Sequence, residues 1–485
     1  MTAVPPLKPV LWDRDEAAAA TGATAYGDPW QATGVSIDSR SIEPGDLFIA
    51  LRGPNNDGHR FAATALAAGA AAALVDHHPE GAPANAPCLI VEDTAAALWA
   101  LAAHARARTG AQVVGVTGSV GKTSAKETLM ACFEAAGLTA HGTVGNLNNH
   151  WGVPLTLARM PRATEAAVIE MGMNHAGEIA PLSELARPDV SLITTIAPAH
   201  LENFDSITGI AKAKAEIFAG QAPGTVAILP AETAEAAVLV TAAEQAGLTV
   251  RRFGVTTDCD YRLSSYTPGV DRSDVAIELA GQWMRVCLGV TGEHMAINAT
   301  GVIGVCLALG LDADQVAPGL MRMRLMKGRG ERRRIHLPTG PLLLIDESYN
   351  ASPTAMTAAL RSLGAIDPAA GGRRIAVLGD MLELGEEGPA FHAGLLKPLT
   401  EYGIDQVFTC GPQMQRLFDA LPDKMRGETR ATSAELAPVV IERLRPNDMV
   451  MVKGSLGSGM ALVIKTIESA GGPGPVLLEA LQDAF

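Results

Sequence analysis

Cysteine pairs, long hydrophobic runs and an excess of basic residues are all missing from this 485-residue sequence. The six cysteines are scattered, and none is part of a Cys-x-x-Cys pair. This arrangement argues against a zinc site or a disulfide framework. We therefore expect the cysteines to be small buried hydrophobic residues of a protein in a reducing compartment.

The sequence also has little that would interact with a membrane. Its most apolar run, residues 62–75, is only about 14 residues long and mostly alanine, whereas a spanning helix needs about 20 apolar residues. The first residues have no apolar core of the length found in signal peptides. We expect no membrane insertion and a cytoplasmic location.

The net charge of −14 excludes a nucleic-acid surface as the main partner. Aromatic residues make up only 4% of the chain, while nearly half of it is hydrophobic, with much alanine and glycine. This composition is typical of an α/β enzyme, and the length indicates several domains.

The clearest motif is VVGVTGSVGKTS at residues 113–124, in which a short apolar strand leads into a glycine turn and then a helix. Backbone N–H groups and the positive end of the helix dipole converge there, so the segment predicts a phosphate site. Lys122 adds a point charge, and the Thr123 hydroxyl can hold Mg²⁺. The general phosphate loop has glycine at the position of Val116. The predicted nucleotide-binding residues are Thr117, Gly118, Ser119, Val120, Gly121, Lys122, Thr123 and Ser124.

The pattern of strands and helices predicts three α/β units, at residues 1–108, 109–328 and 329–485. In the first unit, Ser39 and Arg40 follow a predicted strand, where they either hold a phosphorylated ligand or form a capped surface turn.

In the second unit, Glu170 and His200 end apolar strands, which places them at the same edge of a parallel sheet as the phosphate loop. Carboxylate oxygens suit Mg²⁺, so Glu170 is a candidate ligand. The third unit reads as a second doubly wound sheet. It begins with GRGERRR, a basic cluster that is either an interdomain hinge or a clamp on nucleotide phosphate.

Several segments together resemble the Mur ligases. They include GNLNNHWGVPLTL at residues 145–157, EMGMNHAGEI at 170–179, APAHLENF at 197–204, IDESYNASP at 345–353, LGDMLELG at 378–385 and VKGS at 452–455. The resemblance extends from about residue 34 to residue 459. It implies an N-terminal domain that binds the UDP end of a substrate, a central ATPase domain and a C-terminal Rossmann-like domain.

Within this family, the motifs are most similar to those of ligases that join D-Ala-D-Ala to UDP-MurNAc-tripeptide with ATP and two Mg²⁺ ions. The resemblance implies catalytic roles for Lys122, Glu170, His200 and Lys214, with Lys214 carrying a carboxylate on its Nζ atom. Thr123, Glu170, His200 and Lys214 would then bind the metal ions. Asn298 would contact adenine, Arg329 phosphate and Asp346 the ribose. The implied substrate-binding residues are Ser39, Arg40, Asn146, Asn148, Asn149, His150 and Asn350.

The chain departs from the family motifs at three positions. Met295 replaces an asparagine beside the adenine, Ser352 an asparagine in the acceptor motif, and Leu456 an arginine after Lys-Gly-Ser. None of these changes touches the phosphate chemistry. A monomer is expected.

Three other interpretations fit parts of the sequence. A sister ligase, such as a folylpolyglutamate synthetase or another Mur ligase, would share the ATP chemistry but lack GNLNNHWGVP. A nucleotide-dependent switch would leave the outer units without a role. A binding module would hold a phosphorylated metabolite without turnover.

Overall fold

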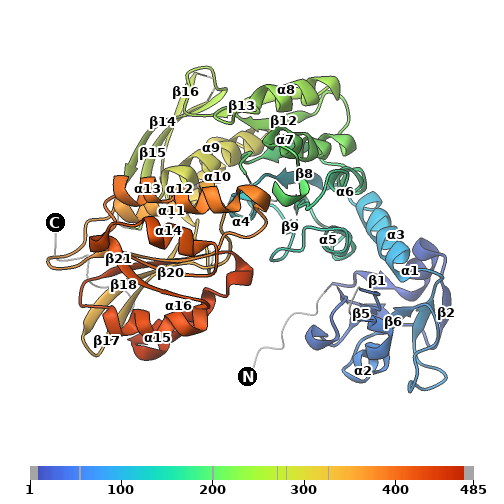
Figure 1. Cartoon of the computed structure of the whole chain (residues 1–485). Coiled ribbons are helices and arrows are strands. Elements are labelled where there is room, and N and C mark those ends of the chain that lie inside the picture. The colour runs from blue at the N-terminus through green and yellow to red at the C-terminus, as the bar shows by residue number, and fades with distance from the viewer. Residues whose placement is uncertain are drawn as a thin grey trace, which may run out of the picture.

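The computed structural model describes residues 9–53, 56–198, 201–269, 271–279, 281–325 and 327–473. It contains three α/β domains, each built around its own main sheet (Figure 1). The central domain connects the N-terminal and C-terminal domains, which lie at opposite sides of the molecule. The predicted fold class is confirmed. The boundaries after residues 108 and 328 stay predictions.

The N-terminal domain contains a five-stranded sheet in the order β2-β7-β6-β5-β4, in which β4 to β7 are parallel. The helix α2 ends at Ala67, and Gly69, with φ of 102°, turns the chain toward β6. The elements are β1 Trp12–Asp13, α1 Arg14–Thr21, β2 Thr24–Tyr26, β3 Gln31–Ala32, β4 Gly34–Ser36, η1 Ser39–Ser41, β5 Asp46–Ile49, η2 Gly58–Phe61, α2 Ala62–Ala67, β6 Ala72–Val75, β7 Cys88–Ile90 and α3 Thr94–Ala107.

The central domain contains a nine-stranded sheet in the order β16-β15-β14-β13-β12-β11-β8-β10-β9. The strands from β9 to β14 in this order are parallel, and β15 and β16 extend the sheet as antiparallel hairpins. These hairpins were not expected from the sequence. The first elements are β8 Gln112–Thr117, α4 Lys122–Ala135, β9 Ala140–Gly142, α5 Gly152–Ala158, β10 Ala166–Glu170, α6 Ile179–Ala186, β11 Val190–Ile193, η3 Leu201–Asn203, α7 Ile207–Ala215 and η4 Glu216–Gly220.

The second half of this domain completes the sheet and adds the helix that faces the phosphate loop. Its elements are β12 Val226–Pro230, α8 Ala236–Gln245, β13 Thr249–Gly254, β14 Tyr261–Pro268, β15 Ser273–Leu279, β16 Gln282–Leu288, α9 Glu293–Ala308 and α10 Ala313–Met321.

The C-terminal domain contains a seven-stranded sheet in the order β21-β20-β19-β22-β18-β17-β23, with β17 and β23 antiparallel. The predicted doubly wound unit is confirmed. Its elements are β17 Glu331–Leu337, β18 Gly340–Glu347, α11 Pro353–Gly364, β19 Arg374–Gly379, η5 Gly385–Glu387, α12 Gly388–Gly394, α13 Leu396–Glu401, β20 Gln406–Cys410, α14 Met414–Ala420, η6 Asp423–Met425, β21 Arg426–Arg430, α15 Ser433–Arg443, β22 Met449–Lys453, η7 Leu456–Ser458, α16 Ala461–Ala470 and β23 Gly472–Pro473.

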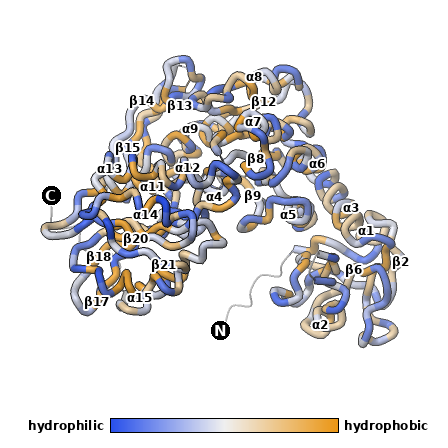
Figure 2. Tube along the Cα trace, in the orientation of Figure 1, coloured by the Kyte–Doolittle hydropathy of each residue, from blue (hydrophilic) through white to orange (hydrophobic). Residues whose placement is uncertain are grey.

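Hydrophobic side chains on both faces of the central sheet hold the phosphate loop in place. Val114 and Val116 of β8 pack on one side with α4 and α9, whereas Val113 packs on the other side with α5 and α6. A strand buried on both faces is typical of a parallel sheet covered by helices. Hydrophobic residues follow the interior strands of the molecule, as in β20 (Figure 2).

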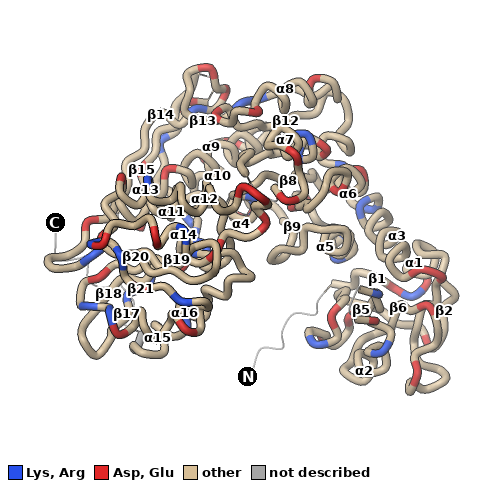
Figure 3. The backbone as a smooth tube through the Cα atoms, viewed as in Figure 1, with Lys and Arg blue, Asp and Glu red and all other residues tan. Residues whose placement is uncertain are grey.

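Charged residues of both signs are spread over all three domains (Figure 3). All six cysteines are free. Cys88, Cys132, Cys306 and Cys410 are buried as predicted, whereas Cys259 and Cys287 are only partly buried. In the described part of the chain, the helices are too short or too polar to cross a bilayer.

Candidate active site

The phosphate loop lies between β8 and α4, and two of its glycines are required by its geometry. Gly118 and Gly121 have φ values of 144° and 91°, which other residues rarely adopt. A Cβ atom on Gly118 would lie 2.0 Å from Oγ1 of Thr194, and one on Gly121 would lie 2.5 Å from Nδ2 of Asn298. α4 begins at Lys122 without a side-chain cap, so its first N–H groups are free to bind an anion.

Lys122 sits at the start of this helix, and its Nζ donates a 2.6 Å hydrogen bond to the carbonyl oxygen of Gly118. Burial lowers the pKa of Lys122, and the nearby Glu170 carboxylate opposes this shift. The ammonium group is therefore held inside the phosphate loop.

Glu170 ends β10 and is 1% exposed. Its Oε1 accepts hydrogen bonds from Nδ2 of Asn148 at 2.8 Å and from Oγ1 of Thr123 at 3.3 Å. Its Oε2 is buried without a hydrogen-bond partner in the described structure. Mg²⁺ prefers oxygen ligands. The unpartnered carboxylate oxygen of Glu170 and the neighbouring hydroxyl of Thr123 are both oxygen ligands, so the two residues fit a magnesium ion.

Lys214 is a buried lysine on α7, with only 2% of its surface exposed. Burial, followed by the charge of Lys122, holds the pKa of Lys214 well below its usual range. Within the described ranges, no residue forms a hydrogen bond or ion pair with it. An amine with a low pKa is more often neutral, and a neutral amine is the form that reacts with carbon dioxide. His200, its predicted metal-binding neighbour, lies outside the described residues.

A cavity of about 570 Å³ opens between the central and C-terminal domains and brings most of the predicted site together. The predicted residues that line it are Ser119, Val120, Gly121, Lys122, Thr123, Ser124, Asn146, Asn148, Asn149, Glu170, Asn298, Arg329 and Asn350.

The C-terminal domain contributes residues to this cavity that the sequence analysis did not identify. Lys453 ends the apolar strand β22, and its Nζ donates to Oε2 of Glu347 and to the carbonyl oxygen of Asn350, each at 3.0 Å. Arg329 stacks on the ring of Tyr349 at 4.2 Å. The sequence contains a signal for Lys453, because it ends the apolar run MVMVK and polar residues at strand ends line ligand sites.

Other predicted residues do not line this cavity. Asp346 accepts hydrogen bonds from Ser348 and Arg333, so its carboxylate is used within the C-terminal domain. The Asp38 carboxylate binds the guanidinium of Arg40, which holds the pKa of Asp38 at about 2. Its Oδ1 also accepts the backbone N–H of Arg40 at 3.0 Å, so these residues form a capped turn, which was one of the two interpretations of this segment. The ligand roles of these residues stay predictions. The predicted residues that do not line the cavity are Ser39, Arg40, Thr117, Gly118, His150, Lys214 and Asp346.

The three departures from the family motifs lie in different surroundings. Met295 is buried in the core of the central domain and also lines the cavity. Ser352 caps α11, where its Oγ accepts from the N–H of Ala355 at 3.3 Å. Leu456 is 64% exposed in η7 and does not line the cavity.

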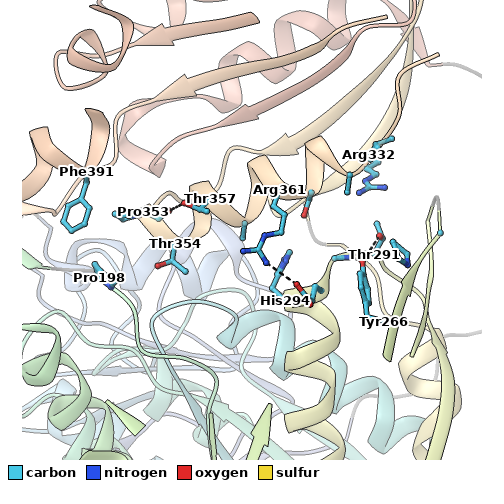
Figure 4. Close-up of a pocket in the computed structure, with 18 residues that line it drawn as sticks. Pro198, Tyr266, Thr291, His294, Arg332, Pro353, Thr354, Thr357, Arg361 and Phe391 are labelled. Carbon is cyan, nitrogen blue, oxygen red and sulfur yellow. Dashed lines mark hydrogen bonds and ion pairs between the residues drawn. The ribbon is translucent and has the colours of Figure 1, made fainter. Parts of the chain in front are cut away.

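A second hollow of about 620 Å³ adjoins the cavity and shares His294 with it (Figure 4). Arg361 of α11 points toward the start of α9, where its Nη1 lies 3.2 Å from Oε2 of Glu293. This ion pair joins the central and C-terminal domains. The GRGERRR cluster is divided: Arg329 lines the cavity and Arg332 the second hollow, while Arg333 pairs with Asp346.

The family models of the Mur ligases match all three domains. The Mur ligase family catalytic domain matches residues 31–106, the middle domain residues 116–306, and the glutamate ligase domain residues 328–456. The UDP-N-acetylmuramoyl-tripeptide--D-alanyl-D-alanine ligase of Escherichia coli K12 is 35% identical over 444 residues, which cover 90% of this chain and 94% of that protein.

Solved structures agree with these matches. MurF from Acinetobacter baumannii has a TM-score of 0.83 and 30% identity, covering 94% of this chain and 98% of that one. MurF ligase from Thermotoga maritima, solved in complex with ADP, has a TM-score of 0.76 and 25% identity. The match covers 90% of this chain and 97% of that one. On the matches in sequence and in fold, this chain belongs to the Mur ligase family.

Proposed function

We propose that this protein is an ATP-dependent amide ligase that joins D-Ala-D-Ala to UDP-MurNAc-tripeptide, giving UDP-MurNAc-pentapeptide, ADP and phosphate. One observation carries this proposal. A single cavity is lined by the phosphate loop, by the buried Glu170 and by Lys453, which ends a strand of the C-terminal sheet. The similarity to ligases with this name over 90% of the chain supports the choice of substrates.

The reaction begins when an oxygen of the terminal tripeptide carboxylate forms a bond to the γ-phosphorus of ATP. The bond between this phosphorus and the bridging oxygen breaks, and ADP leaves. Lys122 and the N–H groups at the start of α4 reduce the repulsion between the two anions, since they place positive charge where negative charge accumulates.

In the second step, the amine nitrogen of D-Ala-D-Ala attacks the carbonyl carbon of the acyl phosphate. The carbon–oxygen bond to phosphate breaks, and the proton that the amine loses passes to the leaving phosphate or to water. Positioning three substrates in one cavity converts this reaction into an effectively intramolecular one. Asn350 and Lys453 lie on the side of the cavity formed by the C-terminal domain, where we place the acceptor.

Mg²⁺ fits this site, as the unpartnered Oε2 atom of Glu170 indicates. Thr123 and Glu170 would hold one ion, and Glu170, His200 and a carboxylated Lys214 would hold a second. Bound Mg²⁺ would neutralise phosphate charge during the transfer. Carboxylation would convert Lys214 from a buried amine into an anion that can bind a metal.

Ser39 and Arg40 would bind the uridine diphosphate, and the loop with Asn146, Asn149 and His150 would bind the sugar and peptide. Asn298, Arg329 and Asp346 would bind adenine, phosphate and ribose. Ser39 and Arg40 do not line the cavity, and we propose that the domains close over the bound substrates. We further infer a monomeric cytoplasmic enzyme of peptidoglycan synthesis, required for cell shape and division.

Acceptor profiling tests the proposed substrate pair. The protein is incubated with ATP, Mg²⁺ and UDP-MurNAc-tripeptide, together with D-Ala-D-Ala, D-Glu, L-Lys or L-Glu in parallel, and products are identified by mass. We expect a UDP-linked pentapeptide with D-Ala-D-Ala alone. A product with a single amino acid but none with the dipeptide would assign the chain to a sister ligase, and no product with any acceptor would contradict the ligase function.

A further inference from the structure

A second group of potential metal ligands lies in the N-terminal domain, outside the cavity described above. His59 belongs to η2, whereas Asp76 and His77 directly follow β6. One ligand atom from each residue lies within 4.8 Å of the other two. The carboxyl ends of the parallel strands β4, β5 and β6 share this edge of the sheet, which is where ligands bind in open α/β sheets.

The two imidazoles of this group meet at one carboxylate oxygen. Nε2 of His59 lies 3.1 Å from Oδ1 of Asp76, and Nδ1 of His77 contacts the same oxygen. Around a tetrahedral zinc ion with bonds near 2.0–2.1 Å, neighbouring ligand atoms lie about 3.3 Å apart. The rings of His59 and His77 are stacked, with centroids 5.3 Å apart, so the two imidazoles lie next to each other beside Asp76.

The residues around the group hold the ligands as the outer contacts of metal sites usually do. Nδ1 of His59 lies 2.6 Å from Oδ1 of Asp57, which fixes the proton on Nδ1 and leaves the lone pair on Nε2. Nη1 of Arg52 lies 2.8 Å from Oδ2 of Asp76, so the guanidinium binds one carboxylate oxygen and Oδ1 is left for the ion. Nε2 of His59 also accepts the Asp76 N–H at 3.2 Å, a long hydrogen bond that a metal bond would replace.

The net charge of this group and the type of its ligand atoms together indicate which ion it would bind. With neutral imidazoles, the carboxylates of Asp57 and Asp76 outweigh the one guanidinium of Arg52, so the group is negative overall. Imidazole with carboxylate favours zinc and similar transition metals, whereas Mg²⁺ favours oxygen ligands.

We propose that His59, Asp76 and His77 bind a divalent transition-metal ion, with Zn²⁺ as the best-matched ion. The bound ion joins η2 to the end of β6 and stabilises the N-terminal domain, because it binds the folded state and not the unfolded chain. The proposal does not depend on the ligase activity or on its magnesium site.

The test uses the full-length protein, freed of metal with a chelator and dialysed against Zn²⁺ in the presence of excess Mg²⁺. Bound zinc is measured by elemental analysis, and thermal unfolding is followed with and without Zn²⁺. We expect one Zn²⁺ per chain and a higher unfolding temperature with the ion. His77→Ala removes an exposed ligand and should weaken Zn²⁺ binding at least about tenfold and abolish the thermal shift.

Two further variants distinguish loss of the metal site from other effects of a substitution. His175→Ala is the matched control, because His175 is also exposed and lies 3.1 Å from an acidic partner, Glu178, but belongs to the central domain. It should bind Zn²⁺ like the native protein. Asp57→Asn keeps all three ligands and should weaken binding about 10–100-fold. Absence of a tightly held Zn²⁺, or equal binding by His77→Ala and His175→Ala, would overturn the proposal.

Discussion

Asn148 donates a 2.8 Å hydrogen bond from Nδ2 to Oε1 of Glu170, so the loop after β9 orients the carboxylate that ends β10. The other carboxylate oxygen, Oε2, is buried without a hydrogen-bond partner in the described structure. This arrangement fixes the direction of Glu170 and keeps one of its oxygens for a cation. The central predictions for the site follow from this pair.

Glu170→Gln keeps the shape of the side chain and removes its charge. We expect phosphate release to fall by about 10²-fold or more, because the neutral amide no longer supplies the negative charge that would hold Mg²⁺ beside the transferred phosphoryl group. Binding of the UDP substrate, measured by calorimetry, should persist. Lys122→Ala should behave in the same way. Glu184→Gln changes an exposed glutamate of α6 and should leave turnover unchanged; native turnover in Glu170→Gln or Lys122→Ala would refute the site assignment.

Lys214→Ala removes the buried amine that we propose to be carboxylated. We expect activity to be lost and then partly restored by short carboxylates such as acetate or formate, because these can occupy the space of the missing carboxylate. Phosphate release at increasing carboxylate concentration measures the rescue. Lys212→Ala, on an exposed position of the same helix, is the control. Full activity of Lys214→Ala without added carboxylate would exclude the carboxylation.

Lys214 should also make stability depend on pH. Its pKa is lowered in the folded state, so unfolding takes up a proton between that pKa and the ordinary value of about 10.4. The free energy of unfolding therefore rises with pH across this window, by at most about 1.4 kcal/mol per pH unit. Urea unfolding between pH 7 and 10 in CO₂-free buffer should show this rise for the native protein relative to Lys214→Met. Parallel curves would contradict the lowered pKa.

Lys126 anchors the loop that carries Asn148. Its ammonium is 1% exposed and donates to the carbonyl oxygens of Thr143 at 2.7 Å and Gly145 at 3.5 Å. Oγ1 of Thr143 in turn accepts the N–H of Glu170 at 3.0 Å. Lys126→Met removes the donor to the carbonyl group of the buried Thr143, which should cost about 1–3 kcal/mol of stability.

Because the loop then loses its support, Lys126→Met should raise the KM for UDP-MurNAc-tripeptide more than the KM for ATP. Steady-state kinetics with each substrate varied in turn measures this difference. Glu127→Gln removes only the half-exposed ion-pair partner of Lys126 and should change stability by less than about 1 kcal/mol. Equal increases in both KM values would indicate a general loss of structure instead.

The sequence could predict those parts of the site whose residues lie close together in the chain. The phosphate loop and Glu170 are each defined by a strand and the few residues after it, so their positions at the sheet edge follow from the fold class. Lys453 and Tyr349 enter the cavity only because the C-terminal domain packs against the central one. The strand end marks Lys453 as a candidate for a ligand site, but the sequence does not show that this site is shared with the phosphate loop of another domain.

The hairpins β14 to β16 were missed for a different reason. β16 alternates buried and exposed residues from Met284 to Leu288, which is the pattern of an edge strand, but the preceding parallel strands favoured a continued α/β series. The GRGERRR cluster could not be resolved from sequence because its arginines diverge. Neighbouring side chains of a strand point to opposite faces, so Arg332 lines the second hollow whereas Arg333 pairs with Asp346.

The most direct test of the account follows the oxygen atoms of the reaction. UDP-MurNAc-tripeptide labelled with ¹⁸O in its terminal carboxylate is incubated with the protein, ATP, Mg²⁺ and D-Ala-D-Ala. The released phosphate is then analysed by mass. We expect each phosphate to carry one oxygen from the carboxylate, and its release to require both the tripeptide and the dipeptide. Unlabelled phosphate, or release without either substrate, would contradict the acyl phosphate and with it the proposed ligase mechanism.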